Sequence, residues 1–115
     1  MKGVGKKFII INGFKYRYIT SKSNEDIKKC EQFIRNKIDE HICWDHFVNN
    51  EKIKNNIWRY FLFNNKYHRD DGPAIILKDE SGNVTFSNWC IEGEYLTEEE
   101  KLNEIRRINL DLCLD

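Results

Sequence analysis

The densest group of side chains that could do chemistry lies in residues 41–46, which contain two histidines, a cysteine and an aspartate. Imidazole, thiolate and carboxylate groups are the ligands that zinc prefers, and a bound metal could activate water for hydrolysis. With Cys30 the set would read Cys-x12-Cys-x2-His through Cys43 and His46, a spacing that zinc sites do not commonly use. We therefore expect no metal site. We predict instead a helix end with Trp44 packed inward and Asp45 and His46 in solvent.

The pair Asp45-His46 also keeps a metal-dependent nuclease open as an alternative. Such a pair is similar to the opening of an HNH nuclease core, in which a metal assists hydrolysis. That core needs a second histidine on a following helix, and the histidine that follows His46 in this chain is His68. The nuclease reading therefore ranks behind a structural one.

The run His68-Arg69-Asp70-Asp71-Gly72-Pro73 is a second candidate site. Its histidine could transfer a proton, its arginine could hold a phosphate, and a carboxylate could orient both. The same residues can build a turn, because Pro73 restricts Gly72 and the Asp71 side chain can bond the backbone two residues on. His68 and Arg69 can then satisfy turn carbonyls. We predict a structural role, with ligand contact by His68, Arg69 and Asp71 as the alternative.

Aromatic and basic residues alternate near the N-terminus, where Phe14, Tyr16 and Tyr18 are interleaved with Lys15 and Arg17. This pattern could stack on single-stranded nucleic acid. The chain has 19 basic and 19 acidic residues, however, so no overall positive field attracts nucleic acid, and we do not expect it as a partner. Hairpins expose edge strands on which another chain can dock. We predict a partner-binding surface at Lys15, Tyr16, Arg17 and Tyr18.

Length and composition fit one soluble domain, because 115 residues with 40% apolar side chains can bury one core. No apolar run approaches the roughly 20 residues of a membrane span, and residues 1–5 lack the apolar stretch of a secretory signal. The four cysteines include no Cys-x-x-Cys pair, so we expect free buried thiols, with a disulfide or zinc as alternatives. These features predict a cytoplasmic protein without cofactors or membrane contact.

Turn signals and apolar periodicity predict the elements of the first half. Asn12-Gly13 between two runs of β-branched and aromatic residues predicts a hairpin over 7–20. Apolar residues at three- and four-residue steps predict a helix over 24–41, preceded by several N-cap candidates. The segment 41–56 is less periodic and is read as a second short helix or an ordered connection.

The second half is read as hairpins followed by a helix. Strands are predicted over 57–63, 74–77 and 84–91, with turn residues between them. Thr97 and Glu100 form a capping box, which begins a helix over 98–112.

An internal repeat lies within the hairpin region, because Phe61–Tyr67 and Trp89–Tyr95 agree position for position in residue character. Residues 57–100, and above all the pattern His-Arg-x-Asp-Gly-Pro-Ala, resemble a hairpin-repeat family of phages and large DNA viruses that is akin to MORN-type repeats. Asn65 stands where that family has glycine, and the unit that begins at Trp89 lacks the second half of the motif. The resemblance implies a hairpin-built sheet and a viral origin, but no reaction.

We therefore predict an α+β fold in one domain, residues 1–115. Antiparallel β-hairpin repeats over 57–97 form a twisted sheet, covered by the helix after the first hairpin and by the C-terminal helix. We expect a non-catalytic viral or phage interaction protein, an inhibitor or accessory factor that binds a host protein. The alternative is a small-ligand or nucleotide-binding module. The oligomeric state stays open.

Overall fold

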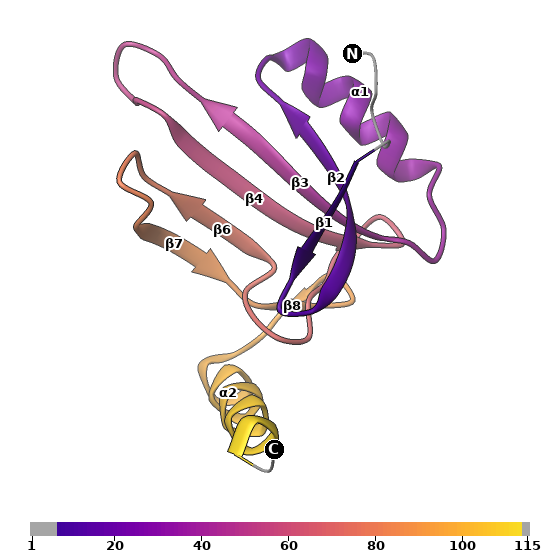
Figure 1. Ribbon diagram of the computed structural model, residues 1–115, viewed down its shortest axis with the longest axis vertical. Coiled ribbons are helices and arrows are strands. Elements are labelled where there is room, and N and C mark those ends of the chain that lie inside the picture. Colours follow the sequence, from indigo (N-terminus) through magenta and orange to yellow (C-terminus); the bar gives the residue numbers. More distant parts are fainter. Residues whose placement is uncertain (1–6, 114–115) are drawn as a thin grey trace.

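The computed structural model describes residues 7–113, with side chains described as far as Ile108. Its centre is a seven-stranded sheet with the strand order β1-β2-β3-β4-β6-β7 and with β5 paired to β4 (Figure 1). These strands are β1 Lys7–Ile11, β2 Phe14–Ser21, β3 His41–Val48, β4 Asn56–Phe63, β5 Lys66–Tyr67, β6 Ile75–Lys78 and β7 Val84–Asn88. A separate two-stranded sheet pairs β8 (Cys90–Ile91) with β9 (Glu94–Tyr95). The α+β class and the mostly antiparallel sheet are confirmed.

One pair of strands, β2 and β3, is parallel, and helix α1 (Asn24–Arg35) forms the crossover between them. A parallel pair requires such a connection, whereas a tight turn suffices for the antiparallel hairpin of β1 and β2. Ser23 is the N-cap of α1, because its side chain accepts a hydrogen bond from the Asp26 backbone N–H at 3.2 Å. Helix α1 begins at Asn24, as predicted, but it ends at Arg35 and not at residue 41.

The interpretation of residues 41–56 as a helix or connection was wrong, because this segment contains the central strand β3. Ile34, Ile38 and Ile42 have helical spacing, but Ile38 is 75% exposed and Ile42 lies in β3. The backbone of β3 is paired on both sides, to β2 and to β4. This pairing overrides a weak local helical pattern, as tertiary context commonly does.

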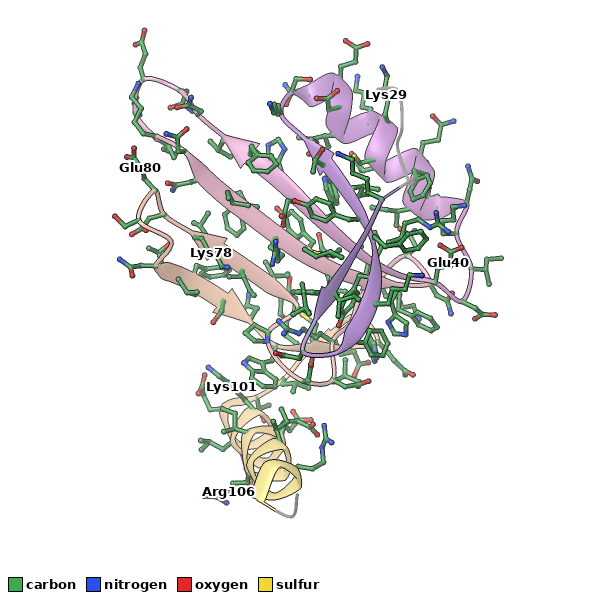
Figure 2. The ribbon with its side chains drawn as sticks, viewed as in Figure 1. Lys29, Glu40, Lys78, Glu80, Lys101 and Arg106 are labelled. Atoms are coloured by element: carbon green, nitrogen blue, oxygen red, sulfur yellow. The ribbon has the colours of Figure 1, made fainter. Side chains whose placement is uncertain are left out.

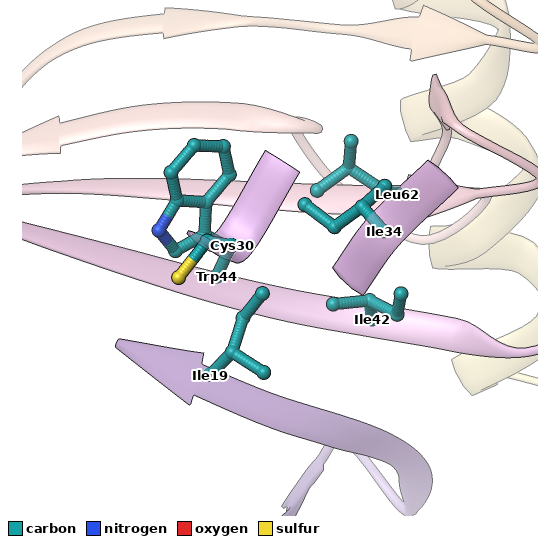
Figure 3. Packing of buried hydrophobic residues seen from close by; sticks show 6 residues of the cluster. All are labelled: Ile19, Cys30, Ile34, Ile42, Trp44 and Leu62. Carbon is teal, nitrogen blue, oxygen red and sulfur yellow. The ribbon is translucent and has the colours of Figure 1, made fainter. Parts of the chain in front are cut away.

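Buried side chains lie on both faces of the sheet. On one face, residues of α1 pack with residues of β2, β3 and β4, as Figure 3 shows for Ile19, Cys30, Ile34, Ile42, Trp44 and Leu62. On the other face, Tyr16, Cys43, Phe61 and Ile76 form a second cluster. Alternation along each strand sends successive side chains to opposite faces, so β3 contributes to both clusters.

The internal repeat, Phe61–Tyr67 and Trp89–Tyr95, forms two hairpins with corresponding registers. In the β4–β5 hairpin Leu62 is opposite Tyr67, and in the β8–β9 hairpin Cys90 is opposite Tyr95. Both turns consist of two residues with positive φ, Asn64-Asn65 in the first and Glu92-Gly93 in the second. A pair of positive φ values is what a two-residue hairpin turn requires, and asparagine adopts it more readily than most residues.

Helix α2 (Glu98–Cys113) begins with the predicted capping box, because Thr97 and Glu100 exchange hydrogen bonds between side chain and backbone. Its predicted place over the sheet was wrong. Figures 1 and 2 show α2, with Lys101 and Arg106, beyond one end of the sheet. Leu102 on its apolar stripe is 50% exposed. The Arg107 guanidinium joins α2 to the body by donating to the Asp70 carbonyl at 3.1 Å.

Within residues 7–113, neither helix is long and apolar enough to cross a bilayer. Cys30, Cys43 and Cys90 are free and buried, as predicted, and the side chain of Cys113 lies outside the described residues. Burial raises the pKa of the Cys30 thiol to about 11 and that of the Cys43 thiol to about 12. These thiols are therefore protonated at neutral pH and unreactive.

Candidate functional site

The loop of residues 68–73 is held together by the side chain of Arg69, which is 8% exposed. The Arg69 Nε donates to the Asp71 carboxylate at 2.8 Å, and Nη1 donates to the Pro73 carbonyl at 3.2 Å. The guanidinium carbon lies 4.3 Å from the centroid of the Phe61 ring, in cation–π geometry. These contacts use the guanidinium within the protein, which fits a structural role for Arg69 and Asp71.

Gly72 is a glycine because the Arg69 side chain passes close over its backbone. A Cβ built on Gly72 would lie 2.8 Å from the Arg69 Cζ and 3.0 Å from Nη1. Gly72 is not among the glycines with positive φ, which are Gly13, Gly82 and Gly93. The requirement at this position is therefore close approach and not a left-handed backbone.

His68 connects this loop to the β8–β9 turn. Its Nδ1 accepts a hydrogen bond from the Glu92 backbone N–H at 3.0 Å, and the Arg69 N–H donates to the Cys90 carbonyl at 3.2 Å. We expected His68 to satisfy a turn carbonyl, but it accepts from a turn N–H. An accepting Nδ1 places the proton of the neutral ring on Nε2, which lies 3.5 Å from an Asp70 carboxylate oxygen.

Several of the residues predicted as sites meet at one small cavity of about 200 Å³. Its lining includes Tyr16, His41, His68, Arg69 and Asp71. The Tyr16 side chain is 4% exposed, and burial raises its pKa to about 12, so its phenol stays neutral. The cavity is too small for most organic ligands, whose sites usually measure about 300–1,000 Å³.

His41 packs among aromatic rings at the edge of this cavity. Its ring stacks on Phe63 at 4.3 Å between centroids, meets Phe14 edge-on at 4.7 Å, and lies 6.3 Å from the His68 ring. Burial is the main reason that the pKa of His41 is lowered, and the charge of a protonated His68 lowers it further, while Asp70 opposes the shift. The fold therefore favours neutral His41.

The lowered pKa of His41 predicts a loss of stability in mild acid. An unfolded histidine titrates near pH 6.5, so below that pH the unfolded chain takes up a proton that folded His41 resists. The contribution is present above about pH 6.5 and is progressively lost as the pH falls below that value. Urea unfolding at pH 7.5 and 5.5 should show a smaller loss for His41→Phe than for the parent. An equal loss in both proteins would remove His41 as the cause.

The cluster in residues 41–46 is divided by strand alternation. His41, Cys43 and Asp45 lie on one face of β3, whereas His46 lies on the opposite face with Trp44. Within the part of the chain that the structure describes, no three His, Cys, Asp or Glu side chains are grouped to hold a metal ion. These residues are close in sequence, but the pleat of β3 directs them to opposite faces of the sheet.

Asp45 is the centre of a buried polar network, and its predicted exposure to solvent was wrong. The side chain is 2% exposed. The Tyr18 hydroxyl donates to its carboxylate at 2.6 Å, and Arg59 donates to both carboxylate oxygens at 2.8 Å. The hydrogen bond that Arg59 donates to Asp45 raises the pKa of Arg59, and burial together with that carboxylate raises the pKa of Tyr18. Arg59 is therefore held as a cation and Tyr18 as a neutral phenol.

Ser21 and His46 form a pair that the sequence did not reveal, because it depends on the parallel register of β2 and β3. Ser21 Oγ lies 2.7 Å from His46 Nδ1 and accepts from Trp44 Nε1 at 2.9 Å, and the tautomer of the imidazole sets which of Ser21 and His46 is the donor. The distance suits a nucleophile and its base. Ser21 is 1% exposed, however, so the pair serves to orient Trp44 and His46.

The four residues predicted to bind a partner point to opposite faces of β2. Tyr16 and Tyr18 lie on one face, where Tyr16 is buried, while Lys15 and Arg17 lie on the other, where Lys15 is exposed and Arg17 is half-buried. The Lys15 ammonium lies 4.3 Å from the centroid of the Phe8 ring. Arg17 donates from Nη2 to the Glu40 carboxylate at 3.1 Å, and this hydrogen bond lowers the pKa of Glu40. Figure 2 shows Glu40 on the connection between α1 and β3.

The outward side of the first hairpin is an exposed apolar surface with a positive charge, which we call the β1 outer face (Phe8, Ile10, Lys15). Phe8 is 50% exposed and Ile10 is 69% exposed. They lie on β1, which is an edge strand of the sheet and, among residues 7–113, pairs with β2 alone. Residues 8–11 are all apolar, so no alternation in the sequence shows which of these side chains face outward.

A larger groove of about 770 Å³ lies on the helix-covered face of the sheet, beside α1. We call it the α1 groove. One wall is α1 with Glu31 and Arg35, the floor includes Trp44 and Tyr60, and the other wall includes Lys66 and Tyr67. Sequence reasoning missed it, because α1, β3, β4 and β5 meet here only through the tertiary fold.

No family model, no curated protein and no solved structure matches this chain. The role of each surface is therefore inferred from its own residues.

Proposed function

We propose that the protein is a non-catalytic interaction protein that docks on another protein through the β1 outer face and the free edge of β1. The observation that carries this proposal is the exposure of Phe8 and Ile10 on an edge strand. Unpaired backbone groups at such an edge can extend the sheet with a strand of a partner. The two apolar side chains would provide the contact area and Lys15 the preference for an acidic neighbour.

The partner that we propose is a host protein, and the chain acts on it as an inhibitor or accessory factor inside the host cell. The resemblance of residues 57–100 to hairpin-repeat proteins of phages and large DNA viruses supports the viral origin. His68, Arg69 and Asp71 form hydrogen bonds within the fold. These bonds support a structural role, and not a catalytic one, for the motif of residues 68–73.

The docking surface is tested by comparing two edge strands of the same sheet. Phe8 on β1 and Phe86 on β7 are 50% and 45% exposed, so Phe8→Ser and Phe86→Ser are matched changes. Complete burial of such a side chain contributes about 1.5–3 kcal/mol, which corresponds to a loss of about tenfold or more. We expect Phe8→Ser and Lys15→Glu to reduce capture of the partner from host-cell lysate, measured by quantitative mass spectrometry, and Phe86→Ser to leave it unchanged.

Circular dichroism and urea unfolding of each variant provide the control for folding. If Phe86→Ser reduces capture as much as Phe8→Ser, or if only Phe86→Ser does so, the β1 outer face is not the docking surface. Charge reversal at Glu98 and Glu99 on α2 tests the acidic surface as a competitor, and we expect it to have less effect than Lys15→Glu.

A further inference from the structure

The α1 groove has two chemically different ends. Helix α1 runs antiparallel to the parallel strands that it connects, so its last turn lies near the beginning of β3, where Ile42 is opposite Leu62. The β4–β5 turn follows Phe63, the residue after Leu62, so Lys66 is near this same end. The Trp44–Tyr60 pair lies two residues further into the sheet. Arg35 and Lys66 therefore flank one end of the groove and aromatic rings form its interior.

The two cations at this end are free to bind an anion. Arg35 and Lys66 are both exposed, and among the side chains that the structure describes neither has a hydrogen-bonded or ion-paired partner. Glu31 precedes Arg35 by four residues, the favourable order for a helical ion pair, yet no such pair is formed. Arginine can bind phosphate oxygens with two parallel hydrogen bonds, and lysine adds a point charge.

The interior of the groove offers the partly exposed rings of Tyr60 and Tyr67 above the buried Trp44. The centroids of Tyr60 and Tyr67 are 5.7 Å apart with an interplanar angle of 27°, and Trp44 lies 5.2 Å from Tyr60. Tyr60 and Tyr67 are half-buried, and burial raises the pKa of Tyr60 to about 12. Their phenols are therefore neutral, and their rings can pack against a flat ligand as aromatic rings pack with one another.

We propose that the α1 groove binds a nucleoside phosphate, with the phosphate at Arg35 and Lys66 and the base against Tyr60 and Tyr67. Its volume of about 770 Å³ is within the usual range for organic ligands. The Glu31 carboxylate is an acceptor for sugar hydroxyl or base amino groups. This site is separate from the β1 outer face, so binding here neither requires nor excludes the protein partner.

The test is isothermal titration of the full chain with ADP, adenosine and inorganic pyrophosphate. Because charge and ring contacts contribute separately, ADP should bind at least about tenfold more tightly than either fragment. Arg35→Gln with Lys66→Gln should weaken ADP binding about tenfold or more. The matched control, Lys101→Gln with Arg106→Gln on α2, should leave it unchanged. Arg35, Lys66 and Arg106 are exposed and Lys101 is half-buried, so the variants should fold normally.

Tyr67→Leu separates ring contact from charge. It should weaken ADP binding and leave pyrophosphate binding unchanged. Absence of ADP binding at millimolar concentration would overturn the proposal, and so would ADP binding that is insensitive to the Arg35 and Lys66 changes. Pyrophosphate that binds as tightly as ADP would also overturn it, because the groove would then recognise phosphate alone.

Discussion

Asp45→Ala will lower the free energy of unfolding by about 3–5 kcal/mol, the cost that is typical of removing one partner from a buried ion pair. The substitution leaves the Arg59 guanidinium, whose side chain is 21% exposed, without its carboxylate. It also removes the acceptor of the Tyr18 hydroxyl. Urea unfolding at neutral pH measures the change.

Asp39→Asn is the matched control for Asp45→Ala. Asp39 is exposed and has φ 58°, a conformation that asparagine accepts, so the change should have little effect. In the double variant Asp45→Leu with Arg59→Met, apolar packing replaces both charges and should recover much of the loss. An Asp45→Ala protein within about 0.5 kcal/mol of the parent, the range of an ordinary surface substitution, would show that the network contributes little.

Gly72→Ala will destabilise the protein by about 2 kcal/mol, because the added methyl group displaces the Arg69 guanidinium. A flexible arginine can usually move aside. Here the guanidinium is bonded to Asp71 and to the Pro73 carbonyl and lies over Phe61, so displacement disrupts all three contacts. The measurement is urea unfolding, with Gly82→Ala as a comparison in which a backbone of φ 85° is strained but nothing lies near the new methyl group.

The mechanism at Gly72 is isolated by repeating the substitution in an Arg69→Ala protein. Without the guanidinium there is no clash, so Gly72→Ala should cost much less in that background, and the two substitutions should be strongly non-additive. Additive effects would mean that the backbone at Gly72, and not the approach of Arg69, is responsible.

The sequence was informative wherever local chemistry determines structure. Asn12-Gly13 marked the first hairpin, Ser23 lies within the predicted N-cap region, and the Thr97–Glu100 box marked the start of α2. The aligned segments 61–67 and 89–95 form hairpins of corresponding register. The turn and capping signals each act within a few residues, which is the range of turn and capping chemistry.

The misread elements depend on contacts between distant segments. β3 is a strand because β2 and β4 pair with it, and Ile38, which precedes β3 and suggested a longer helix, is exposed. The exposure of Asp45 was misjudged for the same reason, because its partners Tyr18 and Arg59 come from the flanking strands. The α1 groove likewise joins four elements whose arrangement no local pattern specifies.

Hydrogen–deuterium exchange of the protein, free and with its captured partner, tests the central claim most directly. Alternate backbone amides of β1 (Lys7–Ile11) face away from β2 at the edge of the sheet and should exchange readily in the free protein. If a partner docks on β1, these amides should become protected, while those of β7 (Val84–Asn88) should not change. Protection of β7, or of the α1 groove alone, with β1 unaffected would contradict the account.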